Sequence, residues 1–159
     1  MWTVSLCASP SDEKWLLSRC IDLVYISDCL TTILNFIRPR KGKTKKVKLE
    51  IVLTNEEYSY YNFTSQLFIT KKVHTKISCA KSKKHFLQDL VHEFAHYVQF
   101  SIDKVPVFRF AIDHEETSMT TYYKNRTEVQ ARTTARLATE CILLYKKLKS
   151  LKRFLAPIT

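Results

Sequence analysis

The sequence predicts an α+β fold in which a single domain covers residues 1–159. Residues 47–53 alternate apolar and polar side chains, as a strand with one buried face does. Residues 83–101 instead repeat apolar side chains at the spacing of a helix, and a second long helical segment follows over residues 123–155. Since 45% of the residues are hydrophobic and 12% are aromatic, the chain can bury one core of ordinary size.

The first segment, residues 1–46, is expected to contain an N-terminal helix and then a basic loop. Ser9 can cap this helix, and Pro10 suits its first turn, where a backbone N–H is not needed. The helix is expected to continue to about Phe36 and to stop before Pro39. The basic loop contains the single glycine of the chain.

The longest apolar stretch, residues 15–37, is interrupted by Arg19, Asp22 and Asp28, so we expect a buried helix here and no membrane span. The N-terminus lacks the basic start and the long apolar run of a classical signal peptide. Five cysteines, odd in number and without a C-x-x-C pair, favour free buried thiols. The expected location is therefore the cytoplasm or another reducing intracellular compartment.

Residues 47–82 are expected to form a small, mainly antiparallel sheet. The alternating segment Val47–Leu53 is its first strand, Tyr58–Phe63 and Gln66–Thr70 form a hairpin, and Val73–Ser78 adds a short strand. The last strand before the next helix could bind an extended peptide by edge pairing.

Residues 92–96, with the sequence His-Glu-Phe-Ala-His, lie inside the helix expected over residues 83–101. Because side chains four positions apart share one face of a helix, His92 and His96 can bind a single ion. Glu93 is rotated from His92 by about 100°, so its carboxylate can take a proton from a metal-bound water without binding the ion. This pattern is the H-E-x-x-H signature of zinc hydrolases.

The alternative is a surface helix with two solvated histidines. Apolar side chains at helical spacing favour a buried helix instead, and they are Leu87, Leu90, Val91, Phe94, Ala95 and Val98.

A catalytic zinc ion usually has three protein ligands and one open position, so a third ligand is expected elsewhere. Glu128 is the best candidate, because Ala131 and Ala135 share its helix face and allow close packing against the first helix. The alternative role for Glu128 is to complement the helix dipole in the first turn. The remaining downstream candidates are Asp103, Asp113, His114, Glu115, Glu116 and Glu140.

The pattern predicts metal-assisted hydrolysis of a peptide bond with one catalytic Zn²⁺, in which Glu93 is the general base. A further donor should stabilise the oxyanion, and the candidates are Tyr122, Tyr123, His114 and Arg126. Asp89 or His85, one and two turns before His92, could orient an imidazole from behind, although both could equally be ordinary exposed residues.

His92-Glu93-x-x-His96, followed by Glu128-x-x-Ala131-x-x-x-Ala135, resembles the gluzincin branch of the zincin metallopeptidases. The chain is most similar to small intracellular members, such as ImmA/IrrE-type and phage-encoded peptidase domains. The resemblance implies a minimal zincin fold in which His92, His96 and Glu128 bind zinc and Glu93 is the base. The matching segment runs from about residue 47 to residue 145, but only the two helix motifs within it are specific.

The SprT-like group, whose members act near DNA, is a second family with some resemblance. Its third zinc ligand is a histidine, and His114 is the only histidine downstream of His96. The residues around His114 lack the glycines that flank the histidine in that group, so His114 is expected to be a loop residue near the cleft.

The net charge of +11 is concentrated in three clusters of lysine and arginine, within residues 38–48, 71–84 and 146–153. Such clusters attract anionic surfaces, so non-specific nucleic acid is a candidate partner beside a protein or peptide substrate. A lysine-rich solvated surface is the simpler interpretation.

The alternative function is a catalytically idle zincin-like protein that binds nucleic acid or belongs to a viral particle. The intact Glu93 argues against it.

Overall fold

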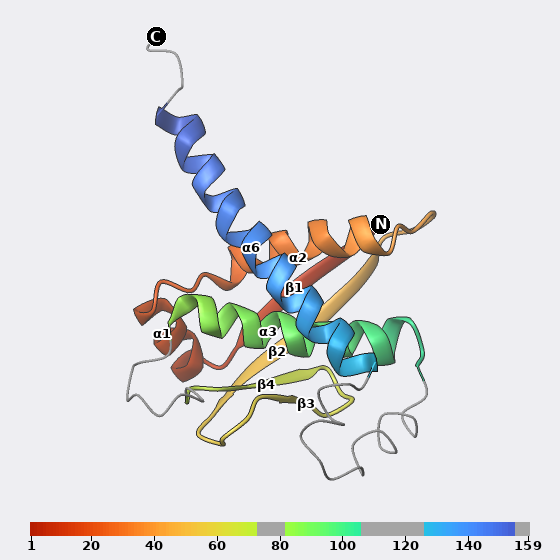
Figure 1. Cartoon of the computed structure of the whole chain (residues 1–159), viewed down its shortest axis with the longest axis horizontal. Helices are drawn as coiled ribbons and strands as arrows, with labels where there is room; N and C mark the ends of the chain where they lie inside the picture. The colour runs from red at the N-terminus through yellow and green to blue at the C-terminus, as the bar shows by residue number, and fades with distance from the viewer. Residues whose placement is uncertain (73–81, 106–125, 155–159) are drawn as a thin grey trace.

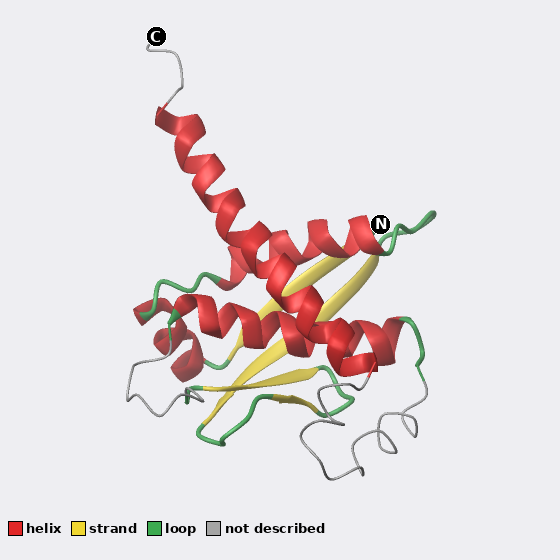
Figure 2. Cartoon of the chain, in the orientation of Figure 1, coloured by secondary structure: helices red, strands yellow, loops and turns green. Residues whose placement is uncertain are grey.

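The computed structural model describes residues 1–72, 82–105 and 126–154, and within this part of the chain one sheet carries helices on one face (Figures 1 and 2). The strands are β1 (Trp2–Ala8), β2 (Lys45–Thr54), β3 (Tyr60–Tyr61) and β4 (Gln66–Thr70). The helices are α1 (Pro10–Ser18), α2 (Leu23–Ile37), α3 (Lys83–Tyr97), the π-helical turn η1 (Val98–Ile102) and α6 (Arg126–Phe154). The predicted α+β fold is confirmed.

The described strands form a mixed sheet in the order β1-β2-β4-β3, and for these strands the expected mainly antiparallel pairing is wrong. β1 pairs with β2 in parallel, and β2 pairs with β4 in parallel. Only β3 and β4 are antiparallel, as predicted for this hairpin. One cause is that residues 2–8 form a strand that was not expected, and the two helices that follow β1 connect it to β2 as a crossover, which parallel strands require. The other is that β3 lies at the edge of the described sheet, so β4, which returns from β3, runs parallel to β2.

The N-terminal segment forms two helices, so the expectation of one helix to Phe36 is wrong. The predicted cap is confirmed, since the Ser9 hydroxyl accepts a hydrogen bond from the backbone N–H of Asp12 at 3.3 Å. The break follows α1, where Cys20 adopts a left-handed backbone with φ 58°. Asp22 then caps α2 by accepting from Val24 at 2.9 Å, and the two helix axes meet at 88°.

The core lies between the sheet and the helices α2 and α3. Alternate residues of β1 are buried at Trp2, Val4 and Leu6, while the residues between them are exposed. The predicted apolar face of α3 is confirmed, and Leu87, Leu90, Val91, Phe94, Ala95 and Val98 are all buried.

The helices α3 and α6 cross in front of the sheet, and α6 extends beyond the rest of the molecule (Figure 1). The predicted helix over residues 83–101 is confirmed as α3 and η1 together. The described part of the final helix begins at Arg126. The expected strand Val73–Ser78 and the expected helix start at Tyr123 lie outside the described residues.

No described helix is long and apolar enough to cross a membrane alone, although α1 and α2 together meet the length and composition criteria as a bent pair. Within the described residues, Cys7, Cys20, Cys29 and Cys141 form no disulfide bond. Of these only Cys29 is buried, so the expectation of buried thiols is wrong for the other three described cysteines.

Candidate metal centre

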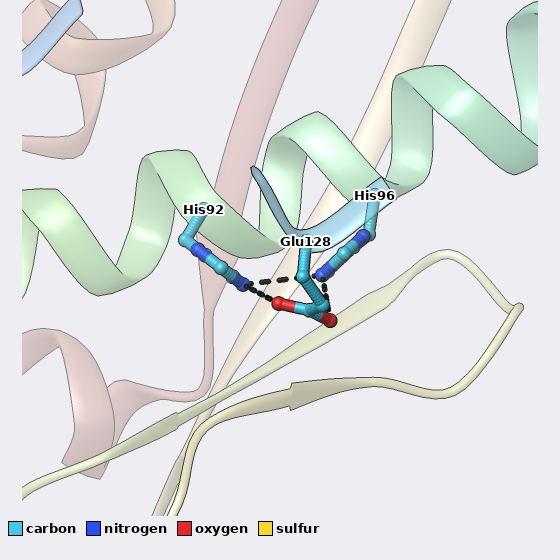
Figure 3. Close-up of side chains that lie close together, drawn as sticks. All are labelled: His92, His96 and Glu128. Atoms are coloured by element: carbon cyan, nitrogen blue, oxygen red, sulfur yellow. Dashed lines mark hydrogen bonds and ion pairs between the residues drawn. The ribbon is translucent and has the colours of Figure 1, made fainter. Parts of the chain in front are cut away.

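His92 and His96 lie one helical turn apart on α3 and point toward the same region (Figure 3). Their Nε2 atoms are 3.1 Å apart, and the two rings stand almost perpendicular, at 81°. His96 is buried, whereas the His92 side chain keeps 19% of its surface exposed. The region is therefore within reach of solvent from the His92 side.

Glu128 reaches the same region from the first turns of α6 (Figure 3). One carboxylate oxygen, Oε2, lies 3.1 Å from Nε2 of His92, and the other, Oε1, lies 3.0 Å from Nε2 of His96. The predicted small-residue face is confirmed, because Ala131 and Ala135 are buried where α6 packs on α3. Close packing of the two helices thus brings Glu128 to the histidines.

These three side chains could hold a metal ion. One atom from each of His92, His96 and Glu128 lies within 4.8 Å of the other two. Two imidazole nitrogens and a carboxylate oxygen form the donor set of several catalytic zinc sites, so the residues fit such an ion.

The charges at the centre favour an ionised carboxylate. Burial alone would raise the pKa of Glu128, but hydrogen bonds from His92 and His96 and their positive charge bring it far below its ordinary value. Burial would likewise lower the pKa of His96, but the hydrogen bond and charge of Glu128 outweigh burial and raise it. The lowered pKa of Glu128 and the raised pKa of His96 have the same cause, which is that a positive charge beside the Glu128 carboxylate stabilises its ionised form. A bound metal ion would supply such a positive charge.

Glu93 is buried on α3 beside this centre, with 6% of its surface exposed. Burial raises its pKa to about 7. Positive charge on His92 and His96 counteracts this rise, whereas the carboxylates of Glu128 and Asp89 add to it. A carboxyl group with such a pKa can exchange a proton near neutral pH.

Gln99 contacts the centre from behind, and the sequence reasoning missed it. Its Oε1 lies 2.9 Å from Nδ1 of His96, and its Nε2 donates to the carbonyl oxygen of Thr127 at 3.0 Å. The same nitrogen donates to Oε1 of Gln130 at 2.8 Å. A signal was available, because a glutamine three positions after a histidine lies on the same helix face.

The hydrogen bonds and ion pairs described for the other predicted residues do not join them to His92, His96 or Glu128. Asp89 accepts a hydrogen bond from Ser59 at 3.2 Å, so a role behind His92 stays a prediction. The ring of His85 lies 2.9 Å from the hydroxyl of Ser82, the cap of α3. Arg126 is exposed at the start of α6.

Two carboxylates considered as ligands are engaged elsewhere. Asp103 pairs with Arg38 at 2.7 Å, and Glu140 pairs with Lys84 at 2.8 Å. The remaining candidates lie outside the described residues, and they are Asp113, His114, Glu115, Glu116, Tyr122 and Tyr123.

An aromatic cluster borders the centre on the side of the hairpin. The ring of Phe100 stacks on His96 with centroids 6.1 Å apart, and Phe63 meets Phe100 edge-on at 5.1 Å. Tyr61 of β3 contacts Phe63 and also bonds to the Ser101 hydroxyl through its own hydroxyl, at 2.7 Å. Phe63 is 41% exposed and holds a left-handed backbone with φ 62°.

No family model matches the chain, and no curated protein or solved structure is significantly similar to it.

Proposed function

We propose that this protein is a zinc-dependent metallopeptidase of the gluzincin type, which hydrolyses peptide bonds. The observation that carries the proposal is the convergence of His92, His96 and Glu128, from two separate helices, on one point beside a buried glutamate. The H-E-x-x-H spacing gives that glutamate a chemical task that a purely structural metal site does not need.

Zinc suits this donor set better than the harder cations, because imidazole nitrogens are poor ligands for Mg²⁺ and Ca²⁺. His92, His96 and Glu128 would supply three ligands, which leaves a fourth position open. When bound there, zinc would polarise the scissile carbonyl group and acidify a water molecule.

Glu93 would act as the general base and then as the general acid. Its carboxylate accepts the proton of the attacking water, and it later gives that proton to the nitrogen of the leaving amine. The peptide bond and one water molecule are thereby converted into a carboxylic acid and an amine. Since nearby cations lower the pKa of a carboxyl group, a bound metal would keep Glu93 ionised and ready to accept.

The edge of the sheet offers a place for an extended substrate. β3 is an edge strand of the described sheet and lies next to α3, which carries the two histidines. A peptide could pair with this edge through its backbone, as in other peptide-binding sheets. The exposed ring of Phe63, connected to His96 through Phe100, would then favour apolar side chains near the scissile bond.

A peptide-library digestion tests this function. The wild type is expected to cleave a subset of peptides, to lose this activity with a chelator, and to regain it when zinc is restored. His96→Ala should be inactive, while His85→Ala, a matched change at an exposed histidine of the same helix, should remain active. Cleavage that persists in chelator or in His96→Ala would disprove the proposal.

Binding of a polyanion such as nucleic acid is a second candidate function. Lys46 and Lys48 project from the face of β2 opposite the buried Val47 and Leu49. The preceding loop adds Lys41 and Lys43, and none of these four lysines forms an ion pair with a described residue.

Salt-dependent retention on heparin should fall in a Lys46→Glu/Lys48→Glu variant. The double variant Lys14→Glu/Lys147→Glu, at two other exposed lysines, changes the net charge by the same amount and is the control. Equal losses of retention in the two double variants would leave this face without a special role.

A further inference from the structure

Gln99 is a buried amide between the two helices that carry the proposed ligands. It lies in η1 directly after α3, and only 3% of its surface is exposed. Its side chain has three neighbours within hydrogen-bonding distance: Nδ1 of His96, the carbonyl oxygen of Thr127 and Oε1 of Gln130. Because both the oxygen and the nitrogen of this buried amide have hydrogen-bonding partners, the amide holds those partners in a single arrangement.

The neighbours determine which way the amide points. The carbonyl oxygen of Thr127 can only accept a hydrogen bond, so the amide nitrogen of Gln99 must face it. The amide oxygen therefore faces His96, and because this oxygen can only accept, the proton of the imidazole must reside on Nδ1. The Nε2 atom of His96 is then left to bind an ion on the side of Glu128.

The same amide also fixes the helix that delivers the third ligand. Thr127 immediately precedes Glu128, and its carbonyl group accepts from Gln99 at 3.0 Å. Gln130 lies in the same first turns of α6 and accepts a second hydrogen bond at 2.8 Å. One side chain thus connects His96 on α3 with the backbone beside Glu128 on α6.

We infer that Gln99 is a positioning residue that holds the Nε2 atom of His96 and the carboxylate of Glu128 toward the same ion. The ion is that of the proposed function, and the inference deepens that proposal. A carboxylate at this position could accept from His96 but could not donate to Thr127, so both ends of the amide are needed. This requirement separates the inference from a general need for a buried polar residue.

Zinc titration of the purified, metal-free protein tests the inference without any measurement of cleavage. Gln99→Met keeps the length of the side chain but removes both hydrogen-bonding functions, and we expect zinc affinity to fall by roughly 10- to 100-fold. The cavity of about 240 Å³ that Gln99 lines, between α2, α3 and α6, leaves room for the larger sulfur atom. Gln66→Met, which removes an amide from β4, is the matched control and should bind zinc as the wild type does.

A second readout follows the Nδ1 proton of His96 in the zinc-loaded protein by NMR. This proton should exchange slowly in the wild type and rapidly in Gln99→Met, because its acceptor is lost. Gln99→Glu should keep the slow proton but still bind zinc more weakly, since it cannot donate to Thr127. If Gln99→Met fails to fold, the milder Gln130→Met serves in its place, with a loss of about fivefold for one hydrogen bond.

Wild-type zinc affinity and an unchanged Nδ1 proton in Gln99→Met would overturn the inference, whatever the peptidase activity. A wild type that binds zinc tightly but cleaves no peptide would contradict the proposed function alone.

Discussion

The Nε2 atoms of His92 and His96 lie 3.1 Å apart on one face of α3, and a carboxylate oxygen of Glu128 lies within 3.1 Å of each. Helix geometry explains the first distance, because residues four apart are stacked along the axis. The distances to Glu128 depend on how closely α6 packs on α3. The centre is therefore assembled by tertiary packing as much as by local sequence.

Replacement of Glu93 should separate metal binding from catalysis. Glu93→Gln keeps the size of the side chain but cannot accept a proton, so we expect stoichiometric zinc and a fall in kcat of about 10²- to 10⁴-fold. Zinc content and peptide turnover measured on the same sample check this expectation. Glu140→Gln, at an exposed glutamate, is the control. Unchanged turnover in Glu93→Gln would exclude the base role.

Replacement of Glu128 should remove the metal. Glu128→Ala takes away the only carboxylate of the described triad, and zinc affinity should fall by more than the roughly 10- to 100-fold caused by loss of a residue behind a ligand. Glu140→Ala, farther along the same helix, should retain zinc. Full zinc retention in Glu128→Ala, measured after dialysis, would assign the third ligand to another residue such as His114.

The contact between α3 and α6 should be sensitive to added volume. Ala135 is buried in this contact, so Ala135→Leu should lower the free energy of unfolding by about 1–3 kcal/mol through overpacking. It should also weaken zinc binding, because α6 and Glu128 are pushed away from the histidines. Thr133→Leu, on the exposed side of α6, should change neither quantity. Chemical denaturation and zinc titration of the two variants provide the comparison.

The stability of the metal-free protein should depend on pH through the pair formed by His96 and Glu128. The pKa of His96 is raised from 6.5, so its contribution is complete below pH 6.5 and is lost as pH rises through the raised value. The pKa of Glu128 is lowered from 4.5, so its contribution is present above pH 4.5 and is lost as pH falls through the lowered value. The pair therefore stabilises the metal-free fold most between pH 4.5 and pH 6.5, where both contributions are complete.

Above pH 6.5, a bound zinc ion would replace the proton that His96 loses. The increase in Tm caused by zinc should be larger at pH 8 than at pH 5.5, because protons compete with the metal for His96 at the lower pH. Thermal unfolding with and without zinc at the two pH values measures this difference. Because Glu128→Gln removes one of the proposed ligands, zinc should not raise the Tm of this variant at either pH. A zinc-induced increase in this variant with the same dependence on pH would assign the effect to other groups.

Local sequence was sufficient for the parts of the centre that depend on helix periodicity. The spacing of His92 and His96 and the small residues Ala131 and Ala135 allowed the convergence with Glu128 to be predicted before the fold was known. Both features follow from 3.6 residues per turn, a period that a single sequence reveals directly.

The parallel part of the sheet could not be predicted in the same way. The alternation of Trp2, Val4 and Leu6 was a usable strand signal, but the partner of β1 is chosen by the crossover through α1 and α2. The break between these helices depends on the left-handed turn at Cys20, a residue type that rarely takes this conformation. Gln99 was missed because its partners on α6 are about 30 residues away in the sequence.

The most direct test of the central claim is the zinc content of the purified protein, measured by native mass spectrometry together with elemental analysis. One tightly bound zinc ion per chain is predicted for the wild type, and none for His92→Ala, His96→Ala or Glu128→Ala, provided that each variant remains folded. A wild type that binds no zinc, or a folded His92→Ala/His96→Ala variant that still binds one, would contradict the account.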